Sequence, residues 1–206
     1  MLPISSNPAT RPAPGRVALF GGSFDPPHLG HLEIARAAKD AAALDRVLFL
    51  PCATSPHKTE SPPAPAPDRL KMLHALVRGH ESWAEVSDID LKLPYPSFTW
   101  RTLNAVRPLL PDGTQLYWIL GADQWNQLER WAEPDKLRQA LHFLVFPREG
   151  DTLAHRNGWN ATFLEARHPA SSSAIRHSIR TGSHLWHSMV TPEIRALIEN
   201  HQLYQR

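Results

Sequence analysis

A short apolar segment that ends in a glycine turn and leads into a helix constrains the fold of this chain most strongly. Residues 16–22 read RVALFGG, which is typical of a buried strand closed by a glycine turn. An alanine-rich helix is expected at about residues 30–42, because its apolar side chains can share one face. Residues 46–51, RVLFLP, form a second β-type run. This order of strand, helix and strand predicts a parallel βαβ unit with a right-handed crossover.

The rest of the chain continues the alternation of strands and helices. Asp68 is expected to cap the next helix, and Thr191 to cap the last one with Pro192 at its first position. The pattern predicts an α/β fold with a Rossmann-like, doubly wound parallel sheet flanked by helices, and a small C-terminal helical part. Strands are expected at 84–91, 115–123, 141–150 and 161–166, and helices at 68–77, 97–110, 171–182 and 191–204.

Composition indicates one globular domain behind an extension. The chain has 206 residues, of which 42% are hydrophobic, which is enough to bury a substantial core. Residues 1–15 are rich in Pro, Ser and Ala, so we expect a disordered N-terminal extension followed by a single domain over residues 16–206. The proline-rich segment 59–67 is expected to form a surface loop.

Charge and cysteine content exclude several classes of protein. The net charge is only +2 and no long run of Lys and Arg occurs, so we expect no nucleic-acid partner. The single cysteine, Cys52, excludes an internal disulfide framework and a Cys-rich zinc site, and it favours a reducing compartment. No apolar run approaches the roughly 20 residues that span a bilayer, and the N-terminus lacks a signal-peptide pattern. We therefore expect a cytoplasmic protein without membrane contact. The sequence leaves the oligomeric state open.

The glycine turn is a candidate anion-binding site. Gly21 and Gly22 allow close approach of the backbone, and the prolines that follow stiffen the turn. The helix behind the turn presents free N–H groups and the positive end of its dipole. In a parallel sheet, ligands bind at the carboxyl ends of the strands, which is where this turn lies.

His28 and His31 lie three residues apart near the start of that helix. At this spacing both imidazoles can point to one side and reach the same phosphate group. A zinc site is the alternative for two neighbouring histidines, but the sequence contains neither an HExxH arrangement nor a cysteine cluster. A purely structural role in capping or packing the helix is the other alternative.

The segment GGSFDPPHLGHL at 21–32 resembles the signature of the nucleotidyltransferase superfamily with the HxGH motif, whose architecture is similar to the catalytic domain of class I aminoacyl-tRNA synthetases. Within that superfamily, the chain from about Arg16 onward resembles the bacterial nicotinate-nucleotide adenylyltransferases. The resemblance implies transfer of an adenylyl group from ATP to nicotinate mononucleotide, giving nicotinate adenine dinucleotide and pyrophosphate. Phosphopantetheine is the alternative acceptor. A nucleotide-binding regulatory module is the alternative class, and a tRNA-charging enzyme fits the sequence badly.

Four further motifs follow in the order that the family shows. The segment LPCATSPHK resembles the family segment that ends in PHK, so Lys58 would approach the substrate phosphates, whereas by itself it is a surface charge. The segment YPSFTWRTL is similar to the family's PSYTxxTL, whose threonine backbone recognises the nicotinate. This resemblance places Thr99 at the acceptor, although Phe98 stands where the family usually has tyrosine.

The remaining two motifs are ILGADQWNQLERW and SSSAIR. The first resembles the family segment in which Gly121 and Asp123 lie beside the nucleotide and Trp131 stacks on the pyridine ring, while Trp125 is expected to pack in the core. A core role for either tryptophan is the alternative. The second resembles the C-terminal ISSTxIR signature and predicts a second anion site, in which Arg176 grips phosphate in a planar fork. Helix capping alone would also explain its serines.

The sequence shows no activated nucleophile and no Walker A loop, so the acceptor phosphate itself is expected to attack the α-phosphorus of ATP. Mg²⁺ is expected to arrive with ATP, without a metal site built by the protein. We expect His31 and Arg176 to line one common cavity. The catalytic residues are then His28, His31, Lys58 and Arg176; those binding ATP are Gly21, Gly22, Ser23, Phe24, His28, His31, Gly121, Asp123, Ser172, Ser173, Ile175 and Arg176; and those binding the acceptor are Ser23, Lys58, Thr99, Trp131 and Arg148.

Overall fold

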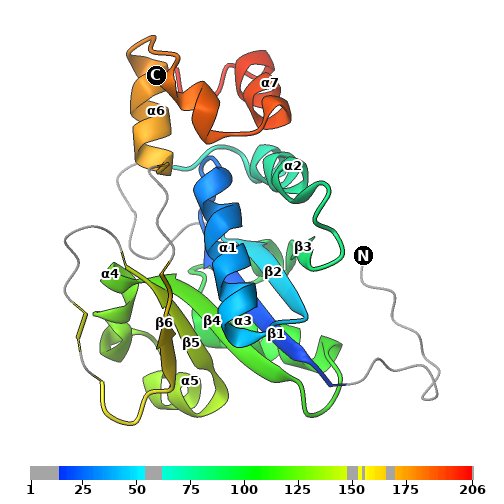
Figure 1. Ribbon diagram of the computed structural model, residues 1–206, viewed down its shortest axis with the longest axis vertical. Coiled ribbons are helices and arrows are strands. Elements are labelled where there is room, and N and C mark those ends of the chain that lie inside the picture. Colours follow the sequence, from blue (N-terminus) through cyan, green and yellow to red (C-terminus); the bar gives the residue numbers. More distant parts are fainter. Residues whose placement is uncertain (1–13, 54–61, 148–152, 155, 166–169, 206) are drawn as a thin grey trace.

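The computed structural model describes residues 14–53, 62–147, 153–154, 156–165 and 170–205. Its centre is a sheet of six strands, shown in Figure 1. The strands are β1 (Arg16–Gly22), β2 (Arg46–Pro51), β3 (Ala84–Val86), β4 (Gln115–Gly121), β5 (His142–Phe146) and β6 (Ala161–Phe163). They lie in the order β3-β2-β1-β4-β5-β6, and every neighbouring pair is parallel. The chain therefore winds outward in both directions from β1 and β4, which confirms the predicted Rossmann-like, doubly wound sheet.

Helices connect the strands and complete the C-terminal part. They are α1 (Leu29–Ala42), α2 (Ala66–Val77), α3 (Thr99–Val106), α4 (Ala122–Trp125), α5 (Pro134–Ala140), α6 (Ser172–Arg180) and α7 (Pro192–Asn200). Short 3₁₀ helices occur at Ile89–Lys92, Arg107–Leu109, Leu128–Arg130 and Leu185–Met189. None of the helices within the described ranges is long and apolar enough to cross a membrane.

Two sequence predictions about local structure were wrong. Helix α2 begins at Ala66 with Pro65 as its N-cap residue, so Asp68 lies inside the first turn and does not cap the helix. The early start follows from the prolines, because the fixed backbone angle of Pro67 fits the first turn of a helix. The strand predicted over 84–91 ends at Val86, and a 3₁₀ helix follows it from Ile89. The cap of α7 is confirmed, since the Ile194 N–H donates to the Thr191 hydroxyl at 3.3 Å.

The core lies in two layers, one on each face of the sheet. Because side chains alternate along a strand, Ala18 and Phe20 of β1 pack in the cluster that contains α1 and α2, whereas Val17 and Leu19 pack with α3 and α5 on the other face. Both sets are almost completely buried. This pattern is expected of a parallel sheet that is covered by helices on both sides.

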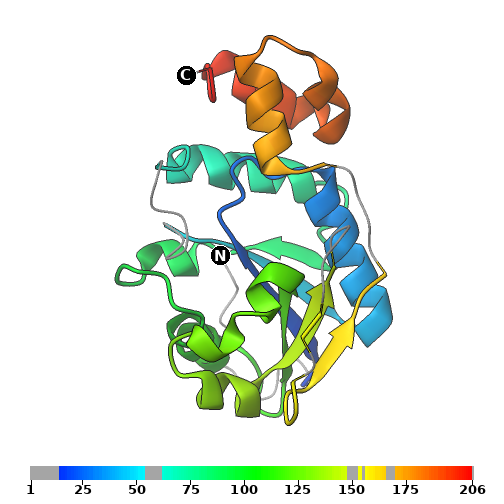
Figure 2. The ribbon, with the colours of Figure 1, turned by 90° about the vertical axis from the view of Figure 1, so that its left-hand side faces the viewer.

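The C-terminal helices α6 and α7 lie at one end of the molecule, where α7 packs against α2 (Figures 1 and 2). Ile175 of α6 and Ile194 and Ile198 of α7 belong to the same buried cluster as α1 and α2. The C-terminal helical part is therefore packed onto the sheet domain, and it brings the end of the chain close to the carboxyl end of β1.

Candidate active site

A cavity of about 1930 Å³ opens at the carboxyl ends of the strands. Gly22 of β1 and Gly121 of β4 contribute to its floor, at the point where the strand order reverses. The N-terminal turns of α1 and α6 both face it, since His31 and Arg176 line the same space. The prediction that these two residues share one cavity is confirmed. Such a crevice is where ligands bind in doubly wound sheets.

Most residues predicted for the site from the sequence line this cavity. They come from the end of β1, the turn after it and the first turn of α1, from the start of α3, from the end of β4 and the segment that follows it, and from the start of α6. The set comprises Gly21, Gly22, Ser23, Phe24, His28, His31, Thr99, Gly121, Asp123, Trp131, Ser172, Ser173 and Arg176.

Three predicted residues stand apart from that set. Ile175 does not line the cavity: its side chain is fully buried in the core, so it supports α6 from behind. Lys58 and Arg148 lie outside the described residues, as do residues 1–13 of the predicted extension.

The two histidines form one unit at the start of α1. His28 is the N-cap residue, and its backbone N–H donates to Nδ1 of His31 at 3.1 Å. The two rings are stacked with their centroids 3.7 Å apart. The ring of Phe24 meets the His31 ring edge-on at 5.0 Å. Because Nδ1 of His31 accepts a hydrogen bond, the proton of its neutral ring is on Nε2, which makes Nε2 a donor.

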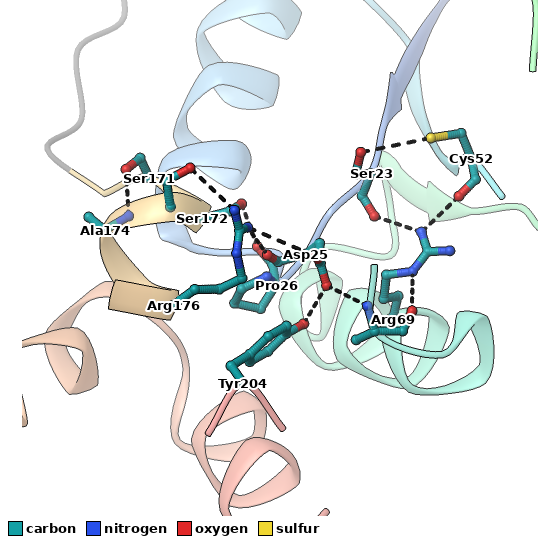
Figure 3. A network of polar contacts seen from close by, with 12 residues as sticks. Ser23, Asp25, Pro26, Cys52, Arg69, Ser171, Ser172, Ala174, Arg176 and Tyr204 are labelled. Carbon is teal, nitrogen blue, oxygen red and sulfur yellow. Dashed lines mark hydrogen bonds and ion pairs between the residues drawn. The ribbon is translucent and has the colours of Figure 1, made fainter. Parts of the chain in front are cut away.

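The start of α6 is docked onto the turn that follows β1, as Figure 3 shows. The Ser172 hydroxyl donates to the carbonyl oxygen of Pro26 at 2.9 Å, and Nη1 of Arg176 donates to that of Asp25 at 2.6 Å. Ser171 caps the helix by accepting from the Ala174 N–H at 3.1 Å. The serines therefore do more than cap the helix, because Ser172 fixes it against the turn.

Arg69 of α2 holds the same turn from the other side, and sequence reasoning missed it. Arg69 is 1% exposed. Nη1 donates to the carbonyl oxygens of Ser23 at 2.7 Å and Cys52 at 2.8 Å, and Nε donates to that of Ala64 at 2.8 Å (Figure 3). The ends of β1 and β2 are thereby tied to α2. In the sequence, Arg69 looks like any surface arginine of an amphipathic helix.

Cys52 is no candidate nucleophile. Its thiol is buried, and this burial, together with the nearby charge of Asp90, raises its pKa. A thiol reacts as the thiolate, which a raised pKa disfavours at neutral pH.

The loop before α3 is held by two side chains. Thr102 donates to the carboxylate of Asp90, which is 4% exposed and whose pKa is raised by burial. Arg101 places its guanidinium 4.9 Å from the ring centroid of Phe98, and it donates to the carbonyl oxygens of Pro94 and Pro96 at 3.3 and 3.4 Å. The loop that presents Thr99 thus has its own support even with Phe98 in place of the usual tyrosine.

The two tryptophans of the segment ILGADQWNQLERW have different roles. Trp125 is 2% exposed, and its Nε1 donates to the carbonyl oxygen of Ala154 at 2.9 Å, which confirms the predicted core position. Trp131 lines the cavity, and its buried Nε1 has no hydrogen-bond partner among the described residues. Trp131 therefore offers its ring to the cavity, whereas its Nε1 atom is covered by protein atoms.

Gly21 of the site is required for space, whereas a side chain at Gly121 would displace only the exposed carboxylate of Asp123. A Cβ atom on Gly21 would lie 2.7 Å from Cζ2 of Trp118, and one on Gly121 would lie 2.5 Å from Oδ1 of Asp123. Neither distance is compatible with an ordinary van der Waals contact. The end of β1 therefore has room only for glycine at position 21.

Together these groups have the chemistry that binding of a polyphosphate requires. Two helix N-termini, the imidazole pair and Arg176 face one cavity and offer N–H donors and positive charge. The aromatic ring of Trp131 and the loop around Thr99 line the same cavity and can receive a flat, polar ring.

Known proteins resemble this chain in sequence and in fold. The family model described as cytidylyltransferase-like matches residues 19–178. A protein of Shouchella clausii is 36% identical over 92% of this chain and 96% of its own length, and one of Synechococcus sp. (strain JA-3-3Ab) is 34% identical over 94% and 96%. Both carry the curated name "Probable nicotinate-nucleotide adenylyltransferase". The structure of Plasmodium falciparum nicotinic acid mononucleotide adenylyltransferase complexed with NaAD has a TM-score of 0.75 at 16% identity, covering 92% of this chain and 97% of that one, which supports the fold.

Proposed function

The chain belongs to the cytidylyltransferase-like family and, within it, to the nicotinate-nucleotide adenylyltransferases. We propose that it binds ATP and nicotinate mononucleotide in this cavity and transfers the adenylyl group from the first to the second. The products are nicotinate adenine dinucleotide and pyrophosphate, which makes the chain an enzyme of NAD biosynthesis. The single observation that carries this proposal in the structure is that His31 and Arg176 line one cavity at two helix N-termini.

In the proposed reaction, a phosphate oxygen of the acceptor attacks the α-phosphorus of ATP. A new P–O bond forms there, the bond from the α-phosphorus to the bridging oxygen breaks, and the electron pair leaves with pyrophosphate. The enzyme must bring two anions together and stabilise the charge that develops. His31 can do so through Nε2–H, because its Nδ1 is occupied by the His28 N–H.

Arg176 and the first turns of α1 and α6 supply the remaining positive potential. The helix termini offer backbone N–H groups, and the guanidinium offers several donors in a plane that matches phosphate oxygens. Lys58, which lies outside the described residues, is proposed from the resemblance as a further cation over the phosphates. Arg148 is proposed in the same way as an acceptor-binding residue.

We propose that Mg²⁺ enters with ATP. When bound, it neutralises the β and γ phosphates and stabilises the leaving pyrophosphate. In the described part of the chain, no group of three or more His, Cys, Asp or Glu side chains could hold a metal ion. Of the carboxylates that line the cavity, Asp25 is bound by Tyr204 and Asp90 by Thr102, and Asp123 is the one proposed to face the ribose hydroxyls. The donors present therefore fit an ion held by phosphates and water.

The acceptor end of the cavity is proposed to lie between Trp131 and the loop of Thr99. The indole can stack on an electron-poor pyridine ring, which contributes on the order of 1 kcal/mol beyond burial of its area. Gly121 and Asp123 lie beside the nucleotide in this arrangement, with the carboxylate available to ribose hydroxyls.

The experiment that tests this proposal measures pyrophosphate release with ATP, Mg²⁺ and each of three acceptors. We expect nicotinate mononucleotide to give the highest kcat/KM, above its amide and above phosphopantetheine. A preference for phosphopantetheine would assign a different acceptor, and binding of ATP without release of pyrophosphate from any acceptor would indicate a regulatory module.

A further inference from the structure

The carboxylate of Asp25 is held on both sides by elements that lie far apart in the sequence. At Oδ1 it accepts from the Tyr204 hydroxyl at 2.8 Å and from the Ala64 N–H at 2.9 Å. Its other oxygen, Oδ2, lies 3.9 Å from Nη1 of Arg176. Figure 3 shows Asp25 between Tyr204 and Arg176. One oxygen thus has two good hydrogen bonds, whereas the contact with the guanidinium is long.

Tyr204 comes from the segment that follows α7, and 179 residues separate it from Asp25. Its hydroxyl is a donor at any physiological pH, because burial and the neighbouring Asp25 carboxylate raise the pKa of the phenol. Tyr204 also lines the cavity that holds His31 and Arg176. No feature of the substrate chemistry described above uses this residue.

We propose that Tyr204 is a positioning residue, which keeps the Asp25 carboxylate from forming a close ion pair with Arg176 and so leaves the guanidinium to the triphosphate. This inference rests on the proposed function, because it concerns the affinity of the same site for ATP. It adds a residue of the C-terminal segment to the machinery at the glycine turn.

The geometry explains why the hydroxyl has this effect. An unrestrained carboxylate next to an arginine forms two parallel hydrogen bonds at about 2.8 Å. Here the backbone carbonyl of Asp25 accepts a hydrogen bond from Nη1 of Arg176 at 2.6 Å. The two donors at Oδ1 keep the carboxylate directed away from the guanidinium. Without the Tyr204 hydroxyl, Asp25 would retain only the Ala64 N–H at that oxygen. Rotation toward Arg176 would then neutralise the charge that the phosphates need.

The side chains are sheltered enough for this competition to matter. The Asp25 side chain is 14% exposed and that of Arg176 is 27% exposed. A pair at such a site is screened by water less than a surface ion pair. A phosphate group and Asp25 would therefore compete for the same donors.

The test measures ATP binding directly by calorimetry, in the presence of Mg²⁺ and without an acceptor. We expect Tyr204→Phe to weaken ATP binding about fivefold to tenfold, the size of effect that one hydrogen bond near a charged group produces. The KM for nicotinate mononucleotide should change less than about twofold, because the acceptor end does not involve Asp25. The matched control is Tyr117→Phe, which removes a hydroxyl bound to Gln115 at 3.3 Å and should leave ATP binding unchanged.

A double-mutant cycle with Asp25→Asn separates positioning from mere support of the fold. Asparagine retains an oxygen for the two donors but cannot pair with Arg176 as an anion. In the Asp25→Asn background, Tyr204→Phe should change ATP binding less than about twofold. Equal weakening in both backgrounds, or no weakening in either, would overturn the inference.

A second variant tests the same claim if Tyr204→Phe does not fold. Ala64→Pro removes the other N–H donor to Oδ1 and leaves the C-terminal segment intact. It should also weaken ATP binding in the wild-type background and not in the Asp25→Asn background. If the unmodified chain itself does not bind ATP, the proposed function fails. If the chain binds ATP and neither variant changes the affinity, only this inference fails.

Discussion

The ring of His28 lies stacked on the ring of His31, and the backbone N–H of the same His28 donates to Nδ1 of His31. The centroid distance is 3.7 Å and the hydrogen bond measures 3.1 Å. One residue therefore fixes both the plane of the neighbouring imidazole and the nitrogen that carries its proton. A donor that is already oriented needs little reorganisation when charge develops on the phosphates.

Replacement of His31 by alanine is expected to lower kcat about 10²-fold to 10³-fold, the loss that removal of one preorganised donor to a transition state causes. The KM values should change much less, because the loss concerns charge that develops during the reaction. Steady-state kinetics with ATP and nicotinate mononucleotide measure both. His74→Ala, which alters an exposed histidine of α2, is the control and should retain full activity. Near wild-type turnover of His31→Ala would refute the role.

Trp131 and Trp125 should respond in opposite ways to removal of the indole. Trp131→Ala is expected to raise the KM for nicotinate mononucleotide about tenfold, because a stacked ring is lost from the cavity, while the melting temperature changes little. Trp125→Ala should lower the free energy of unfolding by about 3–5 kcal/mol, because this side chain fills the core. Kinetics and chemical denaturation of both variants check the contrast. A stability loss in Trp131→Ala as large as that in Trp125→Ala would assign Trp131 to the core.

Arg101 is expected to hold the acceptor loop. Arg101→Met removes the hydrogen bonds to Pro94 and Pro96 and the charge over Phe98, so the loop that presents Thr99 loses its support. We expect the KM for nicotinate mononucleotide to rise several-fold, while calorimetry shows ATP binding unchanged. Arg101→Lys should recover only part of the effect, because lysine lacks the planar fork that spans two carbonyls and stacks on a ring. Equal loss of affinity for ATP would contradict this assignment.

Asp90 should make the stability of the protein depend on pH. Burial raises its pKa above the ordinary value of 3.8, so the folded state holds this proton more tightly than the unfolded state does. The stability that it contributes is fully present below that ordinary value and is lost as the pH rises through the raised pKa. In Asp90→Asn, which retains an oxygen for Thr102, this dependence should disappear. Denaturation from about pH 3 to pH 7 should therefore show wild type losing stability relative to the variant as pH rises.

Those features of the fold that depend on residues close together in the sequence could be predicted from the sequence. The buried run of β1, the helix that follows it and the Thr191 cap all follow from short-range pattern and were found where expected. The start of α2 was missed because Asp68 is a good capping residue in isolation, whereas the prolines before it already fix the first turn.

The candidate site divides in the same way. Its glycines, histidines and serines stand in local motifs, so the sequence and the resemblance pointed to them. Arg69 and Tyr204 were not predicted, because their partners lie 46 and 179 residues away and only the folded chain brings them to Ser23 and Asp25. In the sequence, Arg69 looks like an ordinary arginine on a helix, and Tyr204 looks like an ordinary tyrosine near a terminus.

The contact between Gly21 and Trp118 couples two positions that belong to different strands. Since the indole already fills the volume in which a methyl group at position 21 would lie, variation at one position depends on variation at the other. A library that randomises position 21 alone should return glycine, whereas alanine becomes acceptable once residue 118 is shortened. In evolution, substitutions at positions 21 and 118 should therefore occur together.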